Sequence, residues 1–316
     1  MQTGSSGPAA SAGTVTWRLL RLDAARTLGA ALGGDRQQEA RWFVERVSGY
    51  TSAGLIANDS EFVSARSVAF FDQLLARRCA GEPLQYVLGR WSFRSLDLVV
   101  NPSVLIPRPE TEMVAGLAID AAAAAVSLSR SLSAVADDDP RQHVVVVDLG
   151  TGSGAIALSI VHEVRETLVW ATDASPAALA TARANLAGLG REATRVTMTE
   201  GHWFEALPDE LRGHINVLVS NPPYVATSMK DTMADDVVNH EPHQALFAGP
   251  DGTDDLKHII ENSPAWLAPG GVLILEMSPE QTAWANQQLA DVGFENICVH
   301  KDFTDRPRAL VARKPD

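Results

Sequence analysis

Four consecutive residues, Asn221, Pro222, Pro223 and Tyr224, are of types that could perform chemistry on a planar NH2 group, such as that of an amide or a nucleic-acid base. The nitrogen of such a group is a poor nucleophile because its lone pair is delocalised. If the Asn221 side-chain oxygen and the Pro222 carbonyl accept its two hydrogens, the lone pair is turned toward an electrophile. Tyr224 can cover the flat group and exclude water.

A glycine-rich stretch lies two βα units earlier, between the apolar run VVVV and a predicted helix. Gly150, Gly152 and Gly154 allow backbone conformations closed to other residues and a close approach to a ligand. Their spacing is GxGxG, preceded by Asp148, whereas dinucleotide binders carry GxGxxG. The pattern favours S-adenosylmethionine, whose amino-acid part packs against such a loop. A tight turn with no ligand is the alternative.

The two prolines would make methyl transfer to nitrogen mainly a matter of position. Proline has no N–H to donate and a fixed φ, so the loop holds its acceptors in place. Alignment of nitrogen, methyl carbon and sulfonium sulfur can then contribute on the order of 7 to 11 kcal/mol. No general base is required, because the nitrogen becomes acidic once it is methylated. The alternative is that the prolines only form a turn.

Two further candidates follow neighbouring strands. Asp173 ends the run TLVWATD, where an acid can accept hydrogen bonds from both ribose hydroxyls of an adenosine, although it could also cap the next helix. Trp203, with His202 beside it, could face an adenine ring or could fill the core. Because ligands bind beyond the carboxyl ends of parallel strands, we expect these side chains in one crevice.

A sheet is needed to bring these loops together. The sequence predicts strands, most of them separated by helices, at 144–148, 167–172, 195–199, up to Ser220, and at 272–276, 295–300 and 308–313. Continuous apolar runs such as VVVV and VLILE indicate a sheet covered on both faces. A doubly wound, mostly parallel α/β domain is therefore expected.

The domain organisation follows from changes in residue pattern. Residues 1–14 are rich in Gly, Ser and Ala and are expected to be a disordered tail. Helical spacing predicts a small helical domain at 15–83, and a switch to period two predicts a β-hairpin linker at 84–110. The α/β domain takes 111–316. No role is assigned to the Ala-rich extension at 121–139.

Composition narrows the class of protein. The 316 residues include 26 Lys and Arg against 39 Asp and Glu, a net charge of −13, so naked nucleic acid is a disfavoured partner. Cys79 and Cys298 form no CxxC, which fits a reducing compartment and gives no disulfide framework or thiolate metal site. No apolar run is expected to approach the length of a membrane span. We expect a cytoplasmic monomer without a metal.

Several motifs together carry a family resemblance: DLGTGSG, NPPY, GEPLQYVLG, LIPRPETE, HWFEAL, HEPHQAL and LILEM. The first two resemble class I S-adenosylmethionine-dependent methyltransferases that act on amide or exocyclic amino nitrogens. The whole set, from about residue 40 to near the C-terminus, closely resembles the protein-(glutamine) methyltransferases that modify peptide-chain release factors, the PrmC/HemK family. NPPY alone is shared with DNA and RNA amino methyltransferases, so its combination with IPRPETE is the specific part.

The resemblance implies a seven-stranded class I sheet and methyl transfer to the side-chain amide nitrogen of the glutamine in the Gly-Gly-Gln loop of class I release factors. The helical domain would supply part of the docking surface. The implied cofactor contacts are Gly150, Thr151, Gly152, Ser153, Gly154, Asp173, Trp203 and Asn221. The implied substrate contacts are Asn221, Pro222, Pro223 and Tyr224, with Asn221, Pro222 and Tyr224 catalytic. His202 stands where relatives often carry an acid, which leaves the adenine-edge contact open.

Two further motifs each allow two interpretations. His240 and His243 could suggest a metal site, but the proline between them disfavours a regular helix, and a structured loop near the active site is preferred. Arg108, Glu110 and Glu112 could line a substrate channel or form a salt-bridged helix N-terminus.

Two other function classes compete with protein methylation. Methylation of a base amino group on DNA or RNA would need a basic surface and the energy to flip a base out, and the acidic charge disfavours it. A binding module without chemistry is the other, and the intact Asn221 and Tyr224 argue against it.

Overall fold

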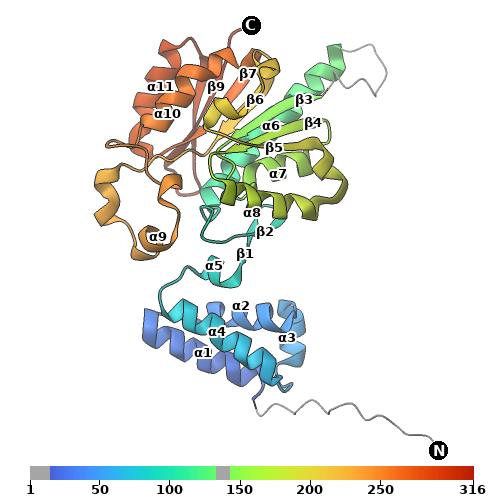
Figure 1. Ribbon diagram of the computed structural model, residues 1–316, viewed down its shortest axis with the longest axis vertical. Coiled ribbons are helices and arrows are strands. Elements are labelled where there is room, and N and C mark those ends of the chain that lie inside the picture. Colours follow the sequence, from blue (N-terminus) through green and yellow to red (C-terminus); the bar gives the residue numbers. More distant parts are fainter. Residues whose placement is uncertain (1–14, 133–142) are drawn as a thin grey trace, which may run out of the picture. The chain divides into compact units, whose positions relative to one another are not determined.

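The computed structural model describes residues 15–132 and 143–316, which form two compact units, Met1–Gly89 and Arg90–Asp316 (Figure 1). The predicted tail at 1–14 and the end of the Ala-rich extension, 133–139, lie outside the described residues.

The first unit is helical, as the spacing of its apolar residues predicts. Its helices are α1 (Trp17–Leu32), α2 (Gln37–Ser48), α3 (Ser52–Asn58), α4 (Ala65–Cys79) and α5 (Leu84–Leu88). The rings of Phe43 and Phe71 pack edge to face with their centroids 6.2 Å apart, and both side chains are fully buried. This pair joins α2 to α4 in the centre of the unit.

The prediction that period two begins at residue 84 is wrong for the first five residues. Leu84–Leu88 is a short helix that follows Pro83 and ends at Gly89, whose φ of 73° lets its N–H reach the Gln85 carbonyl. The alternation is present only farther on, in β1 (Arg90–Phe93) and β2 (Leu96–Val99), which pair antiparallel. The break between the two units therefore falls after Gly89, six residues beyond the predicted end of the helical domain.

The β1–β2 hairpin is part of the second unit and not a free linker. The Asn185 side chain accepts a hydrogen bond from Val99 N at 2.6 Å and donates one to Val99 O at 3.1 Å. Asn101 donates to the Thr181 hydroxyl at 2.9 Å. Both partners lie on helix α8 (Pro176–Leu186), so two buried polar side chains fasten the end of the hairpin to the α/β domain.

The second unit contains the predicted doubly wound sheet. Its strands are β3 (Val144–Leu149), β4 (Thr167–Asp173), β5 (Val196–Glu200), β6 (Ile215–Ser220), β7 (Leu267–Glu276), β8 (Glu295–Lys301) and β9 (Pro307–Arg313). Their order is β5-β4-β3-β6-β7-β9-β8. The strands from β5 to β7 in this order pair parallel, and β9 runs antiparallel to both of its neighbours. The strand order reverses beside β3, where such sheets bind ligands.

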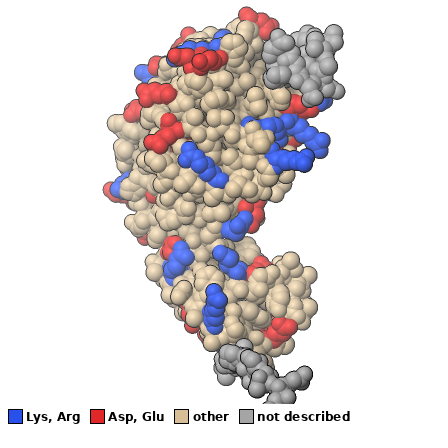
Figure 2. Space-filling model, turned by 45° about the vertical axis from the view of Figure 1, so that its right-hand side comes forward, with Lys and Arg blue, Asp and Glu red and all other residues tan. Residues whose placement is uncertain are grey.

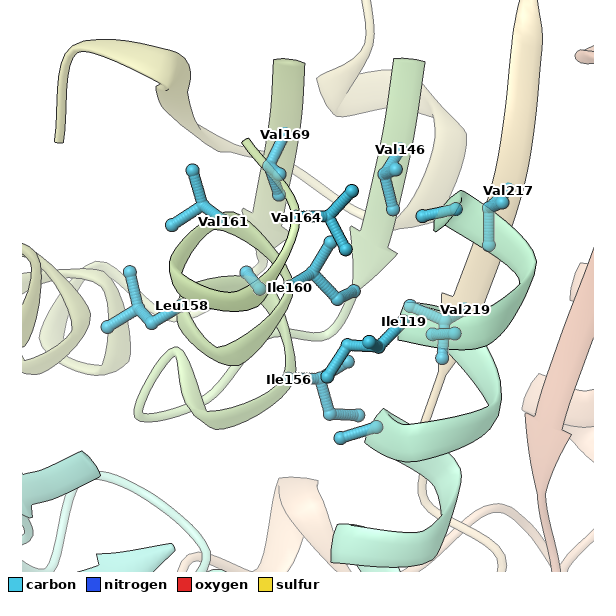
Figure 3. Packing of buried hydrophobic residues seen from close by; sticks show 14 of the residues in the cluster. Ile119, Val146, Ile156, Leu158, Ile160, Val161, Val164, Val169, Val217 and Val219 are labelled. Atoms are coloured by element: carbon cyan, nitrogen blue, oxygen red, sulfur yellow. The ribbon is translucent and has the colours of Figure 1, made fainter. Parts of the chain in front are cut away.

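Helices cover both faces of the sheet (Figure 1). On one face lie α6 (Pro109–Leu132), α7 (Ala155–Glu163) and α8; on the other lie α10 (Asp254–Asn262) and α11 (Thr282–Asp291). Figure 3 shows Ile156 and Ile160 of α7 and Ile119 of α6 against valines of the strands. Burial on both faces is the reason these strands read as continuous apolar runs.

Helix α6 contradicts the expectation that no apolar run approaches the length of a membrane span. Within the described residues, Pro109–Ser131 is long and apolar enough to span a membrane by length and composition alone, with a mean hydropathy of 1.5 in its most apolar window. Its residues Val114, Ala118, Ala122 and Val126 recur at helical spacing and are buried against the sheet. The apolar composition thus forms the core-facing stripe of a helix that packs on strands.

Candidate active site

The loops after β3, β4, β5 and β6 line a cavity of about 250 Å³. Most of the predicted cofactor contacts line it, namely Gly150, Thr151, Gly152, Ser153, Asp173, Trp203 and Asn221. A second cavity of about 190 Å³ is lined by Asn221, Pro222 and Tyr224. Asn221 belongs to both linings, as do Leu105, Arg108 and Ala245, so it lies where the two spaces adjoin. Pro223 lines the first cavity, beside the predicted cofactor residues, and not the second.

Glycine is required for different physical reasons at the three positions of the loop after β3. All have positive φ: 74° at Gly150, 57° at Gly152 and 85° at Gly154. A Cβ on Gly154 would lie 3.0 Å from Leu158 Cδ1, so this glycine permits close packing at the start of α7. A Cβ on Gly152 would meet no atom within 4 Å, so this position is open to the cavity. The loop is therefore shaped for a ligand at Gly152 and for helix packing at Gly154.

Asp148 ties this loop to the helix that follows it. Its Oδ2 accepts a hydrogen bond from the Thr151 hydroxyl at 2.7 Å and another from Ala157 N at 3.1 Å. Burial raises the pKa of Asp148 to about 6, and these two donors offset part of that effect. The Asp148 carboxyl group thus holds the loop in place but does not line the cavity.

Asp173 caps the next helix, which is one of the two roles that its sequence position suggested, and it also holds the glycine loop. Its Oδ1 accepts from Ser175 N at 2.8 Å, at the start of α8, and its Oδ2 accepts from Gly152 N at 2.8 Å. Burial raises the pKa of Asp173, and these two backbone donors oppose the shift. The carboxylate also lines the cavity, and an ionised carboxylate has lone pairs left for further donors. It can therefore accept hydrogen bonds from a ligand while it holds the glycine loop.

Trp203 fills the core, which is one of its two predicted roles, and it also lines the cavity. It begins the 3₁₀ helix Trp203–Ala206 with a φ of 49°, and its side chain, 8% exposed, packs in the core between the sheet and α10. One edge of the ring lies under Gly150, where a Cβ would come within 3.3 Å of it. His202 lines the cavity next to it.

An acid that sequence analysis missed lies next to this indole. Asp255, in the first turn of α10, accepts a hydrogen bond from Trp203 Nε1 at 3.1 Å and also lines the cavity. Acids are common in the first turn of helices, so the sequence carried no signal for this role. Asp255 thus supplies a carboxyl group to the cavity that His202 also lines.

The Asn221 amide is held by a residue from a distant segment. Its Nδ2 donates to the Thr111 hydroxyl at 3.1 Å, which leaves Oδ1 available as an acceptor for a substrate. The Tyr224 hydroxyl donates to Glu276 Oε1 at 3.3 Å. Burial, together with the charge of Glu276, raises the pKa of Tyr224, so the phenol stays neutral. The predicted acceptor and the predicted aromatic cover are thus each fixed by a buried partner.

The two interpretations of the motif IPRPETE apply to different residues of it. Arg108 lines both cavities and forms an ion pair with Glu241, whose side chain is almost fully buried. Glu110 and Glu112 instead lie in the first turn of α6, where Glu110 Oε1 is 3.9 Å from Arg306 Nη2 and Glu112 accepts from Arg94 N. The residue between them, Thr111, is the one that touches Asn221.

The motif HEPH connects the end of α9 (Asp235–His240) to a 3₁₀ helix at His243–Ala245. His243 Nε2 lies 2.8 Å from Val238 O, and Glu241 accepts from Ile106 N at 3.2 Å. No group of three or more His, Cys, Asp and Glu residues that could hold a metal ion is found in residues 15–132 and 143–316. The motif thus holds the segment before α6 against the cavities.

The backbone around Tyr224 is fixed by Gln281, which sequence analysis also missed. Its Nε2 donates to Tyr224 O at 2.9 Å and to Gly252 O at 2.8 Å. Gly252 has a φ of 74°, and a Cβ there would collide with the Tyr224 carbonyl oxygen and lie 2.8 Å from Ala226 N. The loop that carries Tyr224 therefore depends on the absence of a side chain at Gly252.

We expect Gly252→Ala to lower the melting temperature and the rate of methyl transfer together. The matched control is Gly213→Ala, where φ is 72° but a Cβ would meet no atom within 4 Å. Both variants carry left-handed strain of about 1 to 2 kcal/mol, and the collision adds roughly 2 kcal/mol to the first. Thermal unfolding should place Gly252→Ala about 4 to 8 °C below Gly213→Ala. Equal melting temperatures would show that the loop adapts freely.

The fold and the site together define a class of protein. A seven-stranded sheet in which only β9 runs against the other strands, a glycine turn after β3 and the NPPY loop after β6 are the features of a class I methyltransferase. Residues 128–250 match the family model for the methyltransferase small domain, and residues 20–89 match the PrmC N-terminal domain. The fold is also that of the hMettl16 catalytic domain, with a TM-score of 0.53 at 13% identity, over 87% of this chain and 93% of that one.

Curated relatives give the particular family. The release factor glutamine methyltransferase of Moorella thermoacetica is 36% identical over 301 residues, which cover 94% of this chain and 98% of the relative. That of Streptomyces coelicolor is 38% identical over 77% of this chain and 79% of the relative. The chain belongs to the release factor glutamine methyltransferase family, and the resemblance seen in the sequence motifs is confirmed.

Proposed function

We propose that this protein transfers a methyl group from S-adenosylmethionine to the side-chain amide nitrogen of the glutamine in the Gly-Gly-Gln loop of class I release factors. The observation that carries the proposal is the position of Asn221. Its side chain lies at the junction of two cavities, with Nδ2 bound to Thr111 and Oδ1 available. The names of the curated relatives support the choice of acceptor.

The first cavity fits the cofactor. Gly152 is open to it, Asp173 offers a carboxylate, and Trp203 and Ile156 offer apolar surface. When bound there, S-adenosylmethionine would supply an electrophilic methyl carbon. Asp173 would accept hydrogen bonds from ribose hydroxyls, and Asp255 is placed to accept one from an amino group. The match to the methyltransferase small domain also supports S-adenosylmethionine as the cofactor.

The second cavity fits a planar amide. Asn221 Oδ1 and the Pro222 carbonyl would accept the two amide hydrogens, and Tyr224 would cover the flat group. Leu105, Val225 and Leu246 add apolar lining for the methylene groups of a glutamine. Because these groups are held in advance, the residues contribute by orientation and by exclusion of water rather than by proton abstraction.

The competing acceptor, a base amino group on DNA or RNA, is not favoured. The net charge of −13 opposes binding to phosphate backbones. On the face drawn in Figure 2, Lys and Arg side chains stand in small separate groups among acidic ones. A protein acceptor needs no extended basic surface.

The helical unit is proposed to contribute to docking of the release factor. Exposed apolar side chains of this unit include Leu19, Ile56 and Phe62, which are 54%, 75% and 66% exposed. These side chains are accessible to a protein partner, and the match of residues 20–89 to the PrmC N-terminal domain supports the proposal. We propose that the reaction takes place in the cytoplasm, where translation terminates.

The test is incubation with labelled S-adenosylmethionine and a class I release factor whose Gly-Gly-Gln glutamine is intact or replaced by alanine. We expect label on the intact factor and none on the replaced one. Equal labelling of both would place the acceptor elsewhere on the factor. Labelling of a nucleic acid with a steep loss of activity in salt, and none of the factor, would favour the competing function.

A further inference from the structure

The orientation of the Asn221 amide needs a physical cause. An asparagine side chain can rotate by 180° and exchange its oxygen and nitrogen with little change in shape, so hydrogen-bond partners decide which atom faces a site. The contact in question is the one between Nδ2 and the Thr111 hydroxyl, at 3.1 Å. A hydroxyl can donate as well as accept, so Thr111 by itself would tolerate either orientation of the amide.

Glu276 removes this ambiguity. It lies at the end of β7 and is 1% exposed, and its Oε1 accepts from the Tyr224 hydroxyl. Its Oε2 is buried and has no hydrogen-bond partner among the described residues, and the neighbouring Thr111 hydroxyl lowers the pKa of this carboxyl group. An ionised carboxylate can only accept hydrogen bonds, so it draws the single hydrogen of Thr111 and leaves Thr111 lone pairs for Asn221.

We propose that Thr111 and Glu276 are positioning residues that fix the Asn221 amide with its oxygen toward the substrate. This inference rests on the proposed function. With Glu276 ionised, Thr111 accepts from Asn221 Nδ2, and Oδ1 is presented as an acceptor. With Glu276 protonated, its O–H can donate to Thr111, whose hydrogen is then free to turn to Asn221. The flipped amide presents N–H groups to a substrate amide that also offers N–H groups, so the substrate is not held.

The surroundings of Glu276 place this change near neutral pH. Burial raises the pKa of Glu276 to about 7, and Glu110 on α6 acts in the same direction. Thr111, Arg308 on β9 and Tyr224 oppose the shift, and Arg308 Nη2 also lies 3.6 Å from Asp302 Oδ2. Activity is therefore expected above the pKa of Glu276 and is lost as the pH falls through it.

Thr111→Val removes the hydroxyl with little change in shape, and Thr111→Ser keeps it. We expect kcat on the release factor to fall at least tenfold in Thr111→Val and to stay within about threefold of wild type in Thr111→Ser. The affinity for S-adenosylmethionine, measured by calorimetry, should change less than twofold in both. Wild-type kcat in Thr111→Val, or equal losses in both variants, would overturn the proposal.

A pH profile separates positioning from a merely structural role. In wild type and Thr111→Ser, kcat should fall as the pH drops through about 7. In Thr111→Val this fall of kcat at low pH should be absent, because the protonation state of Glu276 no longer affects the orientation of the Asn221 amide. A fall that persists in Thr111→Val and disappears in Tyr224→Phe would show that Glu276 acts through Tyr224 instead, and would overturn the proposal.

One measurement needs no substrate and so distinguishes this proposal from the proposed function. The side-chain NH2 resonances of Asn221 in a 15N-labelled protein can be assigned by their loss in Asn221→Ala. They should titrate near pH 7 in wild type and Thr111→Ser, and not in Thr111→Val. A resonance that does not respond to pH in wild type refutes the proposed coupling of Glu276 to Asn221 through Thr111, even if the release factor is methylated. A response without any methylation refutes only the proposed function.

Discussion

Asn221→Ala should lower kcat for methylation of a release factor by about a hundredfold or more, which corresponds to roughly 2.7 kcal/mol. The physical reason is that, in the proposed reaction, Oδ1 accepts a hydrogen bond from the substrate amide, and alanine offers no acceptor. The affinity for S-adenosylmethionine should change much less, since Gly152, Asp173 and Trp203 remain in the cavity. Single-turnover rates and calorimetric titrations of the same preparations measure the two quantities.

Asn262→Ala is the matched control for this variant. Asn262 is an exposed asparagine at the end of α10, and its side chain donates only to His258 O at 2.8 Å. Its removal should leave kcat unchanged. Turnover by Asn221→Ala close to that of Asn262→Ala would exclude the role assigned to Asn221.

Asp173→Ala should weaken the binding of S-adenosylmethionine by about 10- to 100-fold, because a hydrogen bond to a charged group contributes roughly 1.5 to 3 kcal/mol. The loss has two sources. The carboxylate would no longer accept from the ribose, and Gly152 N and Ser175 N would both lose their acceptor. At saturating cofactor, kcat should fall less than the affinity does. Isothermal titration calorimetry gives the dissociation constant directly.

Asp173→Asn separates these two sources. Its amide keeps one acceptor oxygen, so it can still bind Gly152 N or Ser175 N, but not both with equal strength. We expect a dissociation constant between those of wild type and Asp173→Ala. If neither variant changes the constant beyond twofold, Asp173 only caps α8 and holds no cofactor.

The division into two adjoining cavities explains why the two variants are expected to differ. Asp173 lines only the first cavity, whereas Asn221 lines both. A residue of the first cavity acts mainly on cofactor affinity. A residue at the junction acts on the alignment between the two reactants, and therefore on the rate.

Local sequence was sufficient wherever a local backbone property decided the structure. The positive φ values at Gly150, Gly152 and Gly154 and the missing N–H groups of Pro222 and Pro223 follow from residue type. Strand alternation with helices was likewise enough for the doubly wound sheet, because parallel strands covered on both faces need continuous apolar runs. The helix at Leu84–Leu88 was missed because five residues are too few for a periodic signal to appear.

Only the tertiary structure could decide which side chains hold the site residues in place. Thr111 reaches Asn221 from 110 residues away, and Glu276 reaches Tyr224 from 52 residues away. A threonine in the first turn of a helix and a glutamate at the end of a strand are ordinary in sequence, and their roles exist only once α6 and β7 pack beside β6. Thus the sequence determined which groups could do the chemistry, because that depends on residue type and local backbone. The packing of distant segments decided how these groups are aimed, because a hydrogen bond depends on distances that no local pattern encodes.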